Sequence, residues 1–446
     1  MSQPVEAFRN ALRIPELKQR IIFTLIVLAV YRLGAHIPTP GVNGQALSTY
    51  FSKQGGGVFG FYDMFTGGAL SQATIFALGI MPYISASIIM QLLTAVIPTL
   101  EKLQKEGPEG QKKINEYTRW GTVLLCVIQS IGIATWLRSI GSEMSTPILL
   151  VSGPMFYFFC ILSFTTGSMF IMWLGEQISE HGVGNGISLL IFVSIIGDAP
   201  TAISMMFTMI GNDSISPLVA LMLVALMVAV VAGVILVTTG QRRVPVQYPR
   251  QVKGRKMTAG GRTYLPLRVN QAGVIPIIFA SALLTVPSMI ANGITVPAVQ
   301  DFVTDHMSYD SLLYNLMYAL LIIFFSFFYT AITFNPVEMA DNLKKNGAVV
   351  TGVRQGKATA DYLNRVMTRI TLVGSVFLAL VALLPVFILN FFNIQSFLIA
   401  QFFGGTSLLI LVGVALDTVR QIEQHLIMRN YEGFQKSGRI RGRRSF

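Results

Sequence analysis

Runs of about 20 apolar residues recur along nearly the whole length of this 446-residue sequence. A helix of about 20 residues is long enough to cross the hydrocarbon core of a bilayer. Charged residues make up only 12% of the chain, whereas an ordinary soluble domain has about 25%. The pattern therefore predicts an all-α membrane protein. Ten membrane spans are expected, near residues 20–37, 73–97, 119–137, 154–174, 186–209, 215–239, 271–291, 312–334, 370–392 and 399–417.

Positive charge is concentrated in alternate loops of this ten-span arrangement. An even number of spans places both chain ends on one face, and the ends and loops of that face hold 30 of the 33 Lys and Arg residues. Only Arg32, Lys53 and Arg138 fall elsewhere. Lys and Arg accumulate in the cytoplasmic loops of membrane proteins. We therefore expect a multi-pass protein whose N-terminal segment 1–19 and C-terminal segment 418–446 are both cytoplasmic.

The segment 240–269 is the most basic of these loops. It is longer than orientation alone requires, and its Pro, Gly and Tyr content predicts a protruding hairpin. Contact with anionic lipids is one interpretation of the charge, and docking of a large acidic or RNA-containing partner is another. The basic side chains, which no acidic residue accompanies, are Arg242, Arg243, Arg250, Lys253, Arg255, Lys256, Arg262 and Arg268.

Spans two and seven contain related segments. Residues 79–87 read GIMPYISAS and residues 273–281 read GVIPIIFAS, so five of nine positions are identical at a constant offset of 194. A duplication of five spans would produce this offset, and because five is odd the two halves would insert in opposite orientations. Inverted repeats of this kind place the working site where the halves meet, near the midplane. The matched Ile84 and Ile278 are therefore candidates for a central constriction.

The chemistry of an enzyme is missing from the sequence. Catalytic and ion-coupled membrane proteins keep ionisable residues inside their spans, but here Arg32, Asp198 and Asp417 all fall at span ends. The segment 182–186, Gly-Val-Gly-Asn-Gly, lacks the Lys-Ser/Thr ending of a phosphate-binding loop and is interpreted as a turn. The four histidines are scattered, so we expect no metal site, no cofactor and no enzymatic activity.

Several longer motifs, in order along the chain, resemble the SecY family of channel subunits of the bacterial Sec protein translocon. The motifs are GIMPYISASII at 79–89, WLGEQ at 173–177, GVGNGIS at 182–188, GQRR at 240–243, FNP at 334–336, ADNLKK at 340–345 and GGTSLLI at 404–410. The resemblance implies two inverted five-span halves, 20–209 and 215–417, forming a clamshell around a central pore. It also implies a hinge in the external loop 210–214, near Gly211, and a lateral gate on the opposite side.

The resemblance also implies roles for individual residues. It gives a pore ring of Ile80, Ile84, Ile191, Ile278 and Ile410. It gives a short re-entrant plug helix of Phe61, Tyr62, Asp63, Met64, Phe65, Thr66, Gly67, Gly68, Ala69 and Leu70, a segment for which an interfacial amphipathic helix is the alternative. Lateral-gate positions are Ser87, Gln129 and Pro276, where Gln129 is either a polar clasp or a helix-packing hydrogen bond. Docking positions are Arg242, Arg243, Arg255, Lys256 and Arg354.

A passive channel of this family takes its energy from elsewhere. The resemblance implies a motor ATPase, SecA, a translating ribosome and the proton-motive force as sources, with SecE and SecG as partner subunits. Signal peptides, nascent chains, membrane insertase factors and anionic lipids complete the expected partners, and the bacterial inner membrane is the expected location. The sequence departs from many relatives at Val337, where they carry Arg after Asn-Pro.

Three other functions are consistent with parts of this pattern. A secondary transporter for a small solute also uses inverted repeats, although its midplane usually holds charged or broken elements. An intramembrane enzyme is disfavoured because the catalytic groups are missing. A structural anchor for a membrane complex is the third alternative. Crosslinking of an arrested nascent chain to the isoleucine ring would separate all four.

Overall fold

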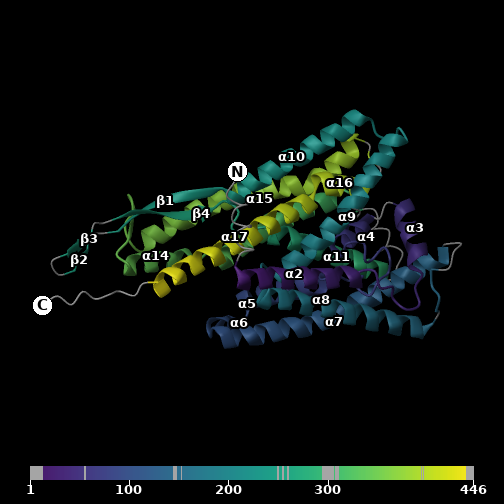
Figure 1. Cartoon of the computed structure of the whole chain (residues 1–446), viewed down its shortest axis with the longest axis horizontal. Helices are drawn as coiled ribbons and strands as arrows, with labels where there is room; N and C mark the ends of the chain where they lie inside the picture. Colours follow the sequence, from purple (N-terminus) through teal and green to yellow (C-terminus); the bar gives the residue numbers. More distant parts are fainter. Residues whose placement is uncertain are drawn as a thin grey trace.

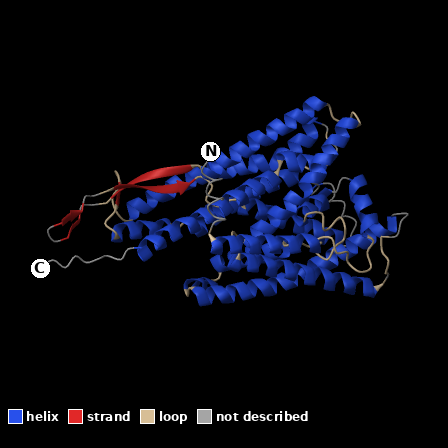
Figure 2. Ribbon diagram, in the orientation of Figure 1, coloured by secondary structure: helices blue, strands red, loops and turns tan. Residues whose placement is uncertain are grey.

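The computed structural model describes residues 14–54, 57–143, 148–151, 153–248, 251–253, 256–258, 261–293, 306, 311–392, 394 and 396–437. Most of these residues are helical, and the longest helices run side by side along one direction (Figure 2). Six described helices are long and apolar enough to cross a bilayer, or eight if each of two bent helix pairs is one span.

The first half of the chain forms helices at the first five predicted spans, together with three shorter helices. In chain order the elements are α2 (Pro15–Gly34), α3 (Gly44–Gln54), α4 (Gly57–Thr66), α5 (Met81–Val96), α6 (Pro98–Lys105), α7 (Pro108–Glu143), α8 (Pro154–His181) and α9 (Gly186–Gly211). Helices α5 and α6 meet at an angle of 100°. Helix α6 therefore turns sharply away from the α5 axis.

The second half forms helices at the other five predicted spans and adds the strands. The elements are α10 (Pro217–Thr239), β1 (Gln241–Gln247), β2 (Gln251–Lys253), β3 (Lys256–Thr258), β4 (Arg262–Arg268), α11 (Ile275–Gly293), α13 (Leu312–Thr333), α14 (Pro336–Lys345), β5 (Val349–Val350), α15 (Lys357–Phe392), α16 (Phe397–Gly404) and α17 (Thr406–Ser437). The tenth predicted span is a bent pair, because α16 and α17 meet at 42°.

Local sequence explains where many of these helices begin. Proline is favoured in the first helical turn, since its missing N–H would be unpaired there in any case. It occupies the first or second position of α2, α5, α6, α8, α10 and α14. Asparagine and serine side chains cap other starts by accepting backbone N–H bonds. The capping residues are Asn185 for α9, Ser216 for α10, Ser311 for α13 and Asn335 for α14.

Only part of the second predicted span is a helix. The sequence predicts a span over 73–97, but α5 begins at Met81. Residues 67–80 form turns instead, and Gly67, Gly68, Ala73 and Gly79 all have positive φ, which a right-handed helix does not allow. This start was predicted wrongly because hydropathy reports burial and does not separate an apolar turn from an apolar helix.

The two halves pack against each other along a seam. Helix α11 of the second half contacts α5 and α7 of the first half, and α17 and α16 contact α9. Helix α4 lies between the halves, since it contacts α9 on one side and α11 and α16 on the other. Figure 1 shows α3 and α4 at one end of the molecule and the β1–β4 hairpin with α14 at the opposite end.

The loop 240–269 forms an antiparallel hairpin that projects from the helices. Strand β1 pairs with β4 along its whole length, with Val244 opposite Leu265, and β5 pairs with the other edge of β1. Val244, Val246 and Leu267 on one face of this sheet are buried in a small apolar cluster against α15. The pairing joins the loops 240–269 and 335–369 into one folded unit.

Candidate functional site

The structure places the five predicted ring isoleucines in the main apolar core, to which both halves contribute. Four helices of both halves supply them: α5 and α9 from the first half, and α11 and α17 from the second. All five are buried, with exposed fractions between 0% and 6%. The residues are Ile84 on α5, Ile80 directly before it, Ile191 on α9, Ile278 on α11 and Ile410 on α17.

The repeated segments adopt the same local structure in both halves. Gly79 has φ of +56° and Gly273 has φ of +64°, a left-handed conformation that favours glycine. Two residues later the helices α5 and α11 begin, at Met81 and Ile275, which preserves the offset of 194. The two helices also contact each other. The repeat found in the sequence is therefore a structural repeat at the interface of the halves.

Helix α4 is buried in this same apolar core. Tyr62, Met64 and Phe65 are at most 5% exposed, and the Tyr62 hydroxyl donates to the carbonyl of Leu78 at 2.7 Å. The Met64 sulfur lies 2.9 Å from the hydroxyl of Ser407 on α17. Helix α4 thus carries contacts to both halves. Of the ten predicted plug residues, Phe61 lies in α4 without a described side chain.

A carboxylate holds the turn that follows α4. Asp63 accepts hydrogen bonds at 2.9 Å from the backbone N–H groups of Leu70 and Ser71 through Oδ1. The Thr66 hydroxyl contacts the same carboxylate oxygen at 3.3 Å. Backbone N–H groups just after a helix otherwise need water, so Asp63 replaces solvent in this turn. The sequence predictions placed Asp63 in the segment but missed this role.

Arg32 links the same turn to two other elements. Its Nη1 donates to the carbonyl of Gly67 at 3.0 Å, and its Nη2 contacts the carbonyl of Gly197 within α9 at 3.3 Å. Arg32 lies in the last turn of α2, so its guanidinium joins the first span, the fifth span and the turn after α4. The sequence showed only that Arg32 is a rare cation on the weakly charged side, which was the available signal.

The three predicted gate residues lie on helices that pack together. Ser87 is on α5, Gln129 on α7 and Pro276 on α11, and each pair of these helices is in contact. Gln129 is 8% exposed, and among the described residues its Oε1 has no hydrogen-bond partner. Ser87 instead accepts from Gln91 of its own helix at 3.3 Å. The helix-packing hydrogen bond that was one interpretation of Gln129 is therefore not formed at this oxygen among the described residues.

The predicted docking residues lie on the hairpin end of the molecule. Arg242 and Arg243 on β1 are exposed, and Arg354 is exposed in the turn between β5 and α15. The pairing of β1 with β5 holds both basic segments on one sheet. Lys256 lies in β3 without a described side chain, and Arg255 lies outside the described residues.

The turn between α8 and α9 explains two sequence motifs. Gly184 has φ of +86°, and the Asn185 side chain accepts from the N–H groups of Ile187 and Ser188. A Cβ on Gly186 would lie 2.0 Å from the carbonyl oxygen of Gly175, so the two helices cross at a distance that only glycine allows. The segment is a capped turn, as the sequence predicted.

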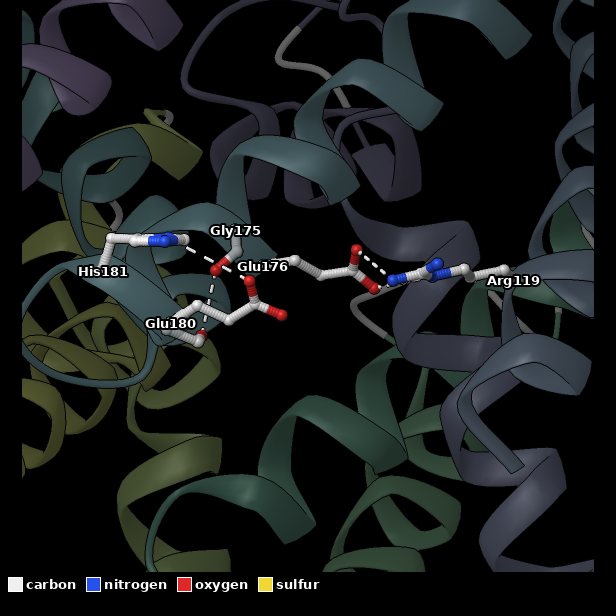
Figure 3. A network of polar contacts seen from close by, with 6 residues as sticks. Arg119, Gly175, Glu176, Glu180 and His181 are labelled. Carbon is white, nitrogen blue, oxygen red and sulfur yellow. Dashed lines mark hydrogen bonds and ion pairs between the residues drawn. The ribbon is translucent and has the colours of Figure 1, made fainter. Parts of the chain in front are cut away.

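An ion pair joins α7 to α8 beside this turn. Arg119 contacts Glu176 through two parallel hydrogen bonds, Nε to Oε1 at 3.0 Å and Nη2 to Oε2 at 2.7 Å (Figure 3). Figure 3 also shows Glu180 and His181, whose Oε2 and Nδ1 atoms are 4.0 Å apart on an exposed surface. The Arg119 side chain is 49% exposed, so the pair contributes at most about 1 kcal/mol.

The described residues contain no group of His, Cys, Asp and Glu side chains arranged to hold a metal ion. Cys126 and Cys160 are free thiols, and both are buried. The candidate site is built mainly from apolar side chains, which can form a constriction.

Comparison with sequence families decides the relationship. The SecY family model matches residues 74–419, which is most of the chain. The chain belongs to the SecY family. It is 44% identical over 430 residues to "Protein translocase subunit SecY" of Aquifex aeolicus, covering 96% of this chain and 99% of that one. It is 45% identical to the protein of that name from Escherichia coli strain K12, covering 96% of each.

Solved structures show the same fold. A protein-conducting channel aligns with a TM-score of 0.65 at 18% identity, covering 94% of this chain and 96% of that one. The structure from a study of the SecY plug domain aligns with a TM-score of 0.62 at 19% identity. Sec61 in a canine ribosome–channel complex aligns with a TM-score of 0.59 at 17% identity. Each alignment covers 94% of this chain and 96% of the other. These matches confirm the predicted ten-span fold of two five-span halves. Family membership confirms the predicted resemblance and a channel subunit rather than an enzyme.

Proposed function

We propose that this chain is the channel subunit of a protein translocase, through which unfolded polypeptides cross the membrane between the two halves. The observation that carries the proposal is that the five predicted ring isoleucines, which come from both halves, are all buried in the main apolar core. Isoleucine side chains offer no hydrogen bonds, so water and ions pass such a constriction at high cost, while a polypeptide can displace them. The ring is then Ile80, Ile84, Ile191, Ile278 and Ile410.

Helix α4 with the turn after it is proposed as the plug of this channel. It lies between the halves and contacts three helices that line the seam. The related structure described as stabilising the closed state and maintaining a membrane seal through its plug domain supports this assignment.

Lateral release is proposed at the seam of α5 and α7 with α11 and α13. An apolar segment of about 20 residues gains free energy on entering lipid, whereas a central Arg or Lys costs about 2.5–3.5 kcal/mol on the insertion scale. Opening beside Ser87, Gln129 and Pro276 would let each segment partition according to its own sequence. The loop 210–214, which begins at the end of α9 near Gly211, is the proposed hinge.

The basic end of the molecule is proposed to face the cytoplasm of a bacterium, with both termini on that side. Arg242, Arg243 and Arg354 are exposed there, and they suit a motor ATPase such as SecA or a ribosome. A structural relative is described in a ribosome–channel complex. SecE and SecG as partner subunits, and energy supplied by SecA, the ribosome and the proton-motive force, are proposed from the family resemblance.

The test is a photocrosslinking experiment with an arrested nascent chain. A photoreactive amino acid is placed at Ile84 or at Ile278, and for control at Leu124 or Leu221, which are apolar but 64% and 66% exposed. We expect adducts to the nascent chain at the two ring positions and adducts to lipid at the control positions. Equal crosslinking of the nascent chain at all four positions would exclude passage through the ring.

A further inference from the structure

We propose that Arg32 is a positioning residue that holds α4 between the two halves, by donating hydrogen bonds to the carbonyls of both Gly67 and Gly197. The inference rests on the proposed role of α4 as a plug. The turn directly after α4 contains Gly67, whose backbone carbonyl accepts one of these hydrogen bonds, so the guanidinium is bonded to the C-terminal end of the proposed plug helix.

The geometry requires arginine rather than any cation. The two acceptors belong to different elements, the turn at Gly67 and the middle of α9, and one planar guanidinium reaches both through Nη1 at 3.0 Å and Nη2 at 3.3 Å. A lysine ammonium is a single charged point on a flexible stem and does not offer this fork. Hydrogen bonds from a charged donor are also about twice as strong as neutral ones.

Both acceptor positions are glycines whose missing side chains make room for the guanidinium. A Cβ on Gly197 would lie 2.5 Å from Nη1 and 2.6 Å from Cζ of Arg32. A Cβ on Gly67 would lie 3.1 Å from Nη1 and 3.0 Å from the backbone Cα of Ser194. The arginine, the turn and α9 therefore fit together only without side chains at these two positions.

The surroundings hold the arginine in place from several directions. Directly before Arg32 on α2, the Tyr31 hydroxyl lies 2.6 Å from the Ser194 hydroxyl of α9, which fixes the two helices beside the contact. Asp198 follows Gly197 on α9, and its Oδ1 lies 3.7 Å from the Cβ position that a side chain on Gly68 would have. The two hydrogen bonds from Arg32 to Gly67 and Gly197, here called the clamp, therefore join the proposed plug to two spans of the first half.

The position of α4 can be read out chemically. In a chain with both native cysteines replaced by alanine, Met64→Cys and Ser407→Cys place thiols on α4 and α17, whose native side chains approach to 2.9 Å. A short bifunctional thiol reagent should join them rapidly when α4 is seated, and the joined channel should stop transporting preprotein. Resting ion conductance in planar bilayers is the second measurement.

Arg32→Ala is expected to slow this crosslinking and to raise resting conductance, each by about tenfold, since two charge-assisted hydrogen bonds are lost. Transport of preprotein should persist, because displacement of α4 is part of opening. Arg138→Ala removes another cation of the weakly charged side, exposed on α7, and should change neither measurement. Arg32→Lys should behave like Arg32→Ala. A wild-type crosslinking rate and wild-type resting conductance in the lysine variant would refute the need for the two-pronged guanidinium donor.

A glycine pair provides a test that leaves Arg32 in place. Gly67 and Gly68 have φ of +66° and +80°, so alanine strains the backbone at both. At Gly67 the new Cβ would crowd α9 and the guanidinium at 3.0–3.1 Å, whereas at Gly68 the nearest atom is 3.7 Å away, an ordinary van der Waals distance. Gly67→Ala should reproduce the raised resting conductance of Arg32→Ala, and Gly68→Ala should show a lower resting conductance than Gly67→Ala.

The outcomes separate the clamp from the plug. If joining the two cysteines leaves transport unaffected, the proposed plug is wrong. If joining them blocks transport while Arg32→Ala crosslinks and conducts as the parent does, the plug stands and the clamp is refuted. Equal effects of Gly67→Ala and Gly68→Ala would attribute the change to backbone strain and would also count against the clamp.

Discussion

At the scale of single residues, the seam is closed by side chains that make no directional bonds. Ile84 and Ile278 come from the repeated segments of opposite halves and are 5% and 6% exposed. Their closure depends on van der Waals packing, which is weak for each atom pair and falls steeply with separation. Such a contact can open around a passing chain and close again without breaking any hydrogen bond.

The double variant Ile84→Ser with Ile278→Ser is expected to conduct ions at rest. Two hydroxyls would offer hydrogen bonds to water and would also leave space where methyl groups are lost. Single-channel recording in planar bilayers measures the effect. Ile26→Ser with Ile128→Ser is the matched control, because these isoleucines are 57% and 51% exposed on the outer faces of α2 and α7. If the resting conductance of the ring variant is no higher than that of the control, Ile84 and Ile278 do not contribute to the seal.

The glycine crossing of α8 and α9 gives a second prediction for a single residue. Gly186→Ala would place a Cβ 2.0 Å from the Gly175 carbonyl oxygen, and neither backbone can yield without separating the helices. We expect a loss of about 1–3 kcal/mol in stability, the usual range for overpacking. Gly211→Ala is the control, since no described atom lies within 4 Å of its Cβ position. Thermal unfolding in detergent compares the two, and equal midpoints would contradict the close crossing.

At the scale of elements, strand pairing gives the basic loops a fixed geometry. β5 is only two residues long, yet its pairing with β1 connects two loops that are about 100 residues apart in sequence. The turn carrying Arg354 follows β5 directly, so its position depends on that sheet. A partner that contacts this end therefore meets a formed surface rather than two independent loops.

Arg354→Glu is expected to cut preprotein transport into membrane vesicles by at least about tenfold, because reversal of a charge at a docking surface costs binding energy. The protein should still insert in normal amount. Arg262→Glu makes the same change of charge at an exposed position on β4 and should have a smaller effect. Normal transport by Arg354→Glu, or equal loss in both variants, would argue against a specific role for this turn.

At the scale of the whole molecule, the two ends differ in charge and in structure. The hairpin, α14 and the basic loops lie at one end, and α3 and α4 lie at the other (Figure 1). The distribution of Lys and Arg predicts that the hairpin end faces the cytoplasm. This orientation would set which face the proposed motor can reach and on which face the proposed plug lies.

Labelling of single cysteines tests that orientation. Both native cysteines are 0% exposed and can be replaced by alanine, after which Arg138→Cys and Arg262→Cys each introduce one thiol at opposite ends of the molecule. A membrane-impermeant maleimide added to intact cells is expected to label Arg138→Cys alone. Both should react after lysis, which confirms that each thiol is accessible. Labelling of Arg262→Cys in intact cells would reverse the assigned topology.

Hydropathy and charge predicted the ten spans, and the repeated segments 79–87 and 273–281 predicted the pairing of spans two and seven. Each of these signals is local or recurs at a constant offset in the sequence. The start of α5 was missed because residues 67–80 are apolar but turn at positions of positive φ. The bonds of Asp63 and Arg32 were also missed. Each depends on which distant backbone groups the fold brings close, as between Arg32 and Gly197, and no pattern in one sequence contains that information.

Helix α4 has neighbours on both sides of the seam: α9 in one half, α11 and α16 in the other. Any widening of the seam removes some of these neighbours before a polypeptide has entered. Spreading of the halves would separate α4 from α11 and α16 while its contacts with α9 remain, so it would loosen part of what holds the proposed plug. Under this arrangement no separate signal would be needed to begin displacing α4, because separation of the halves would itself remove part of its contacts.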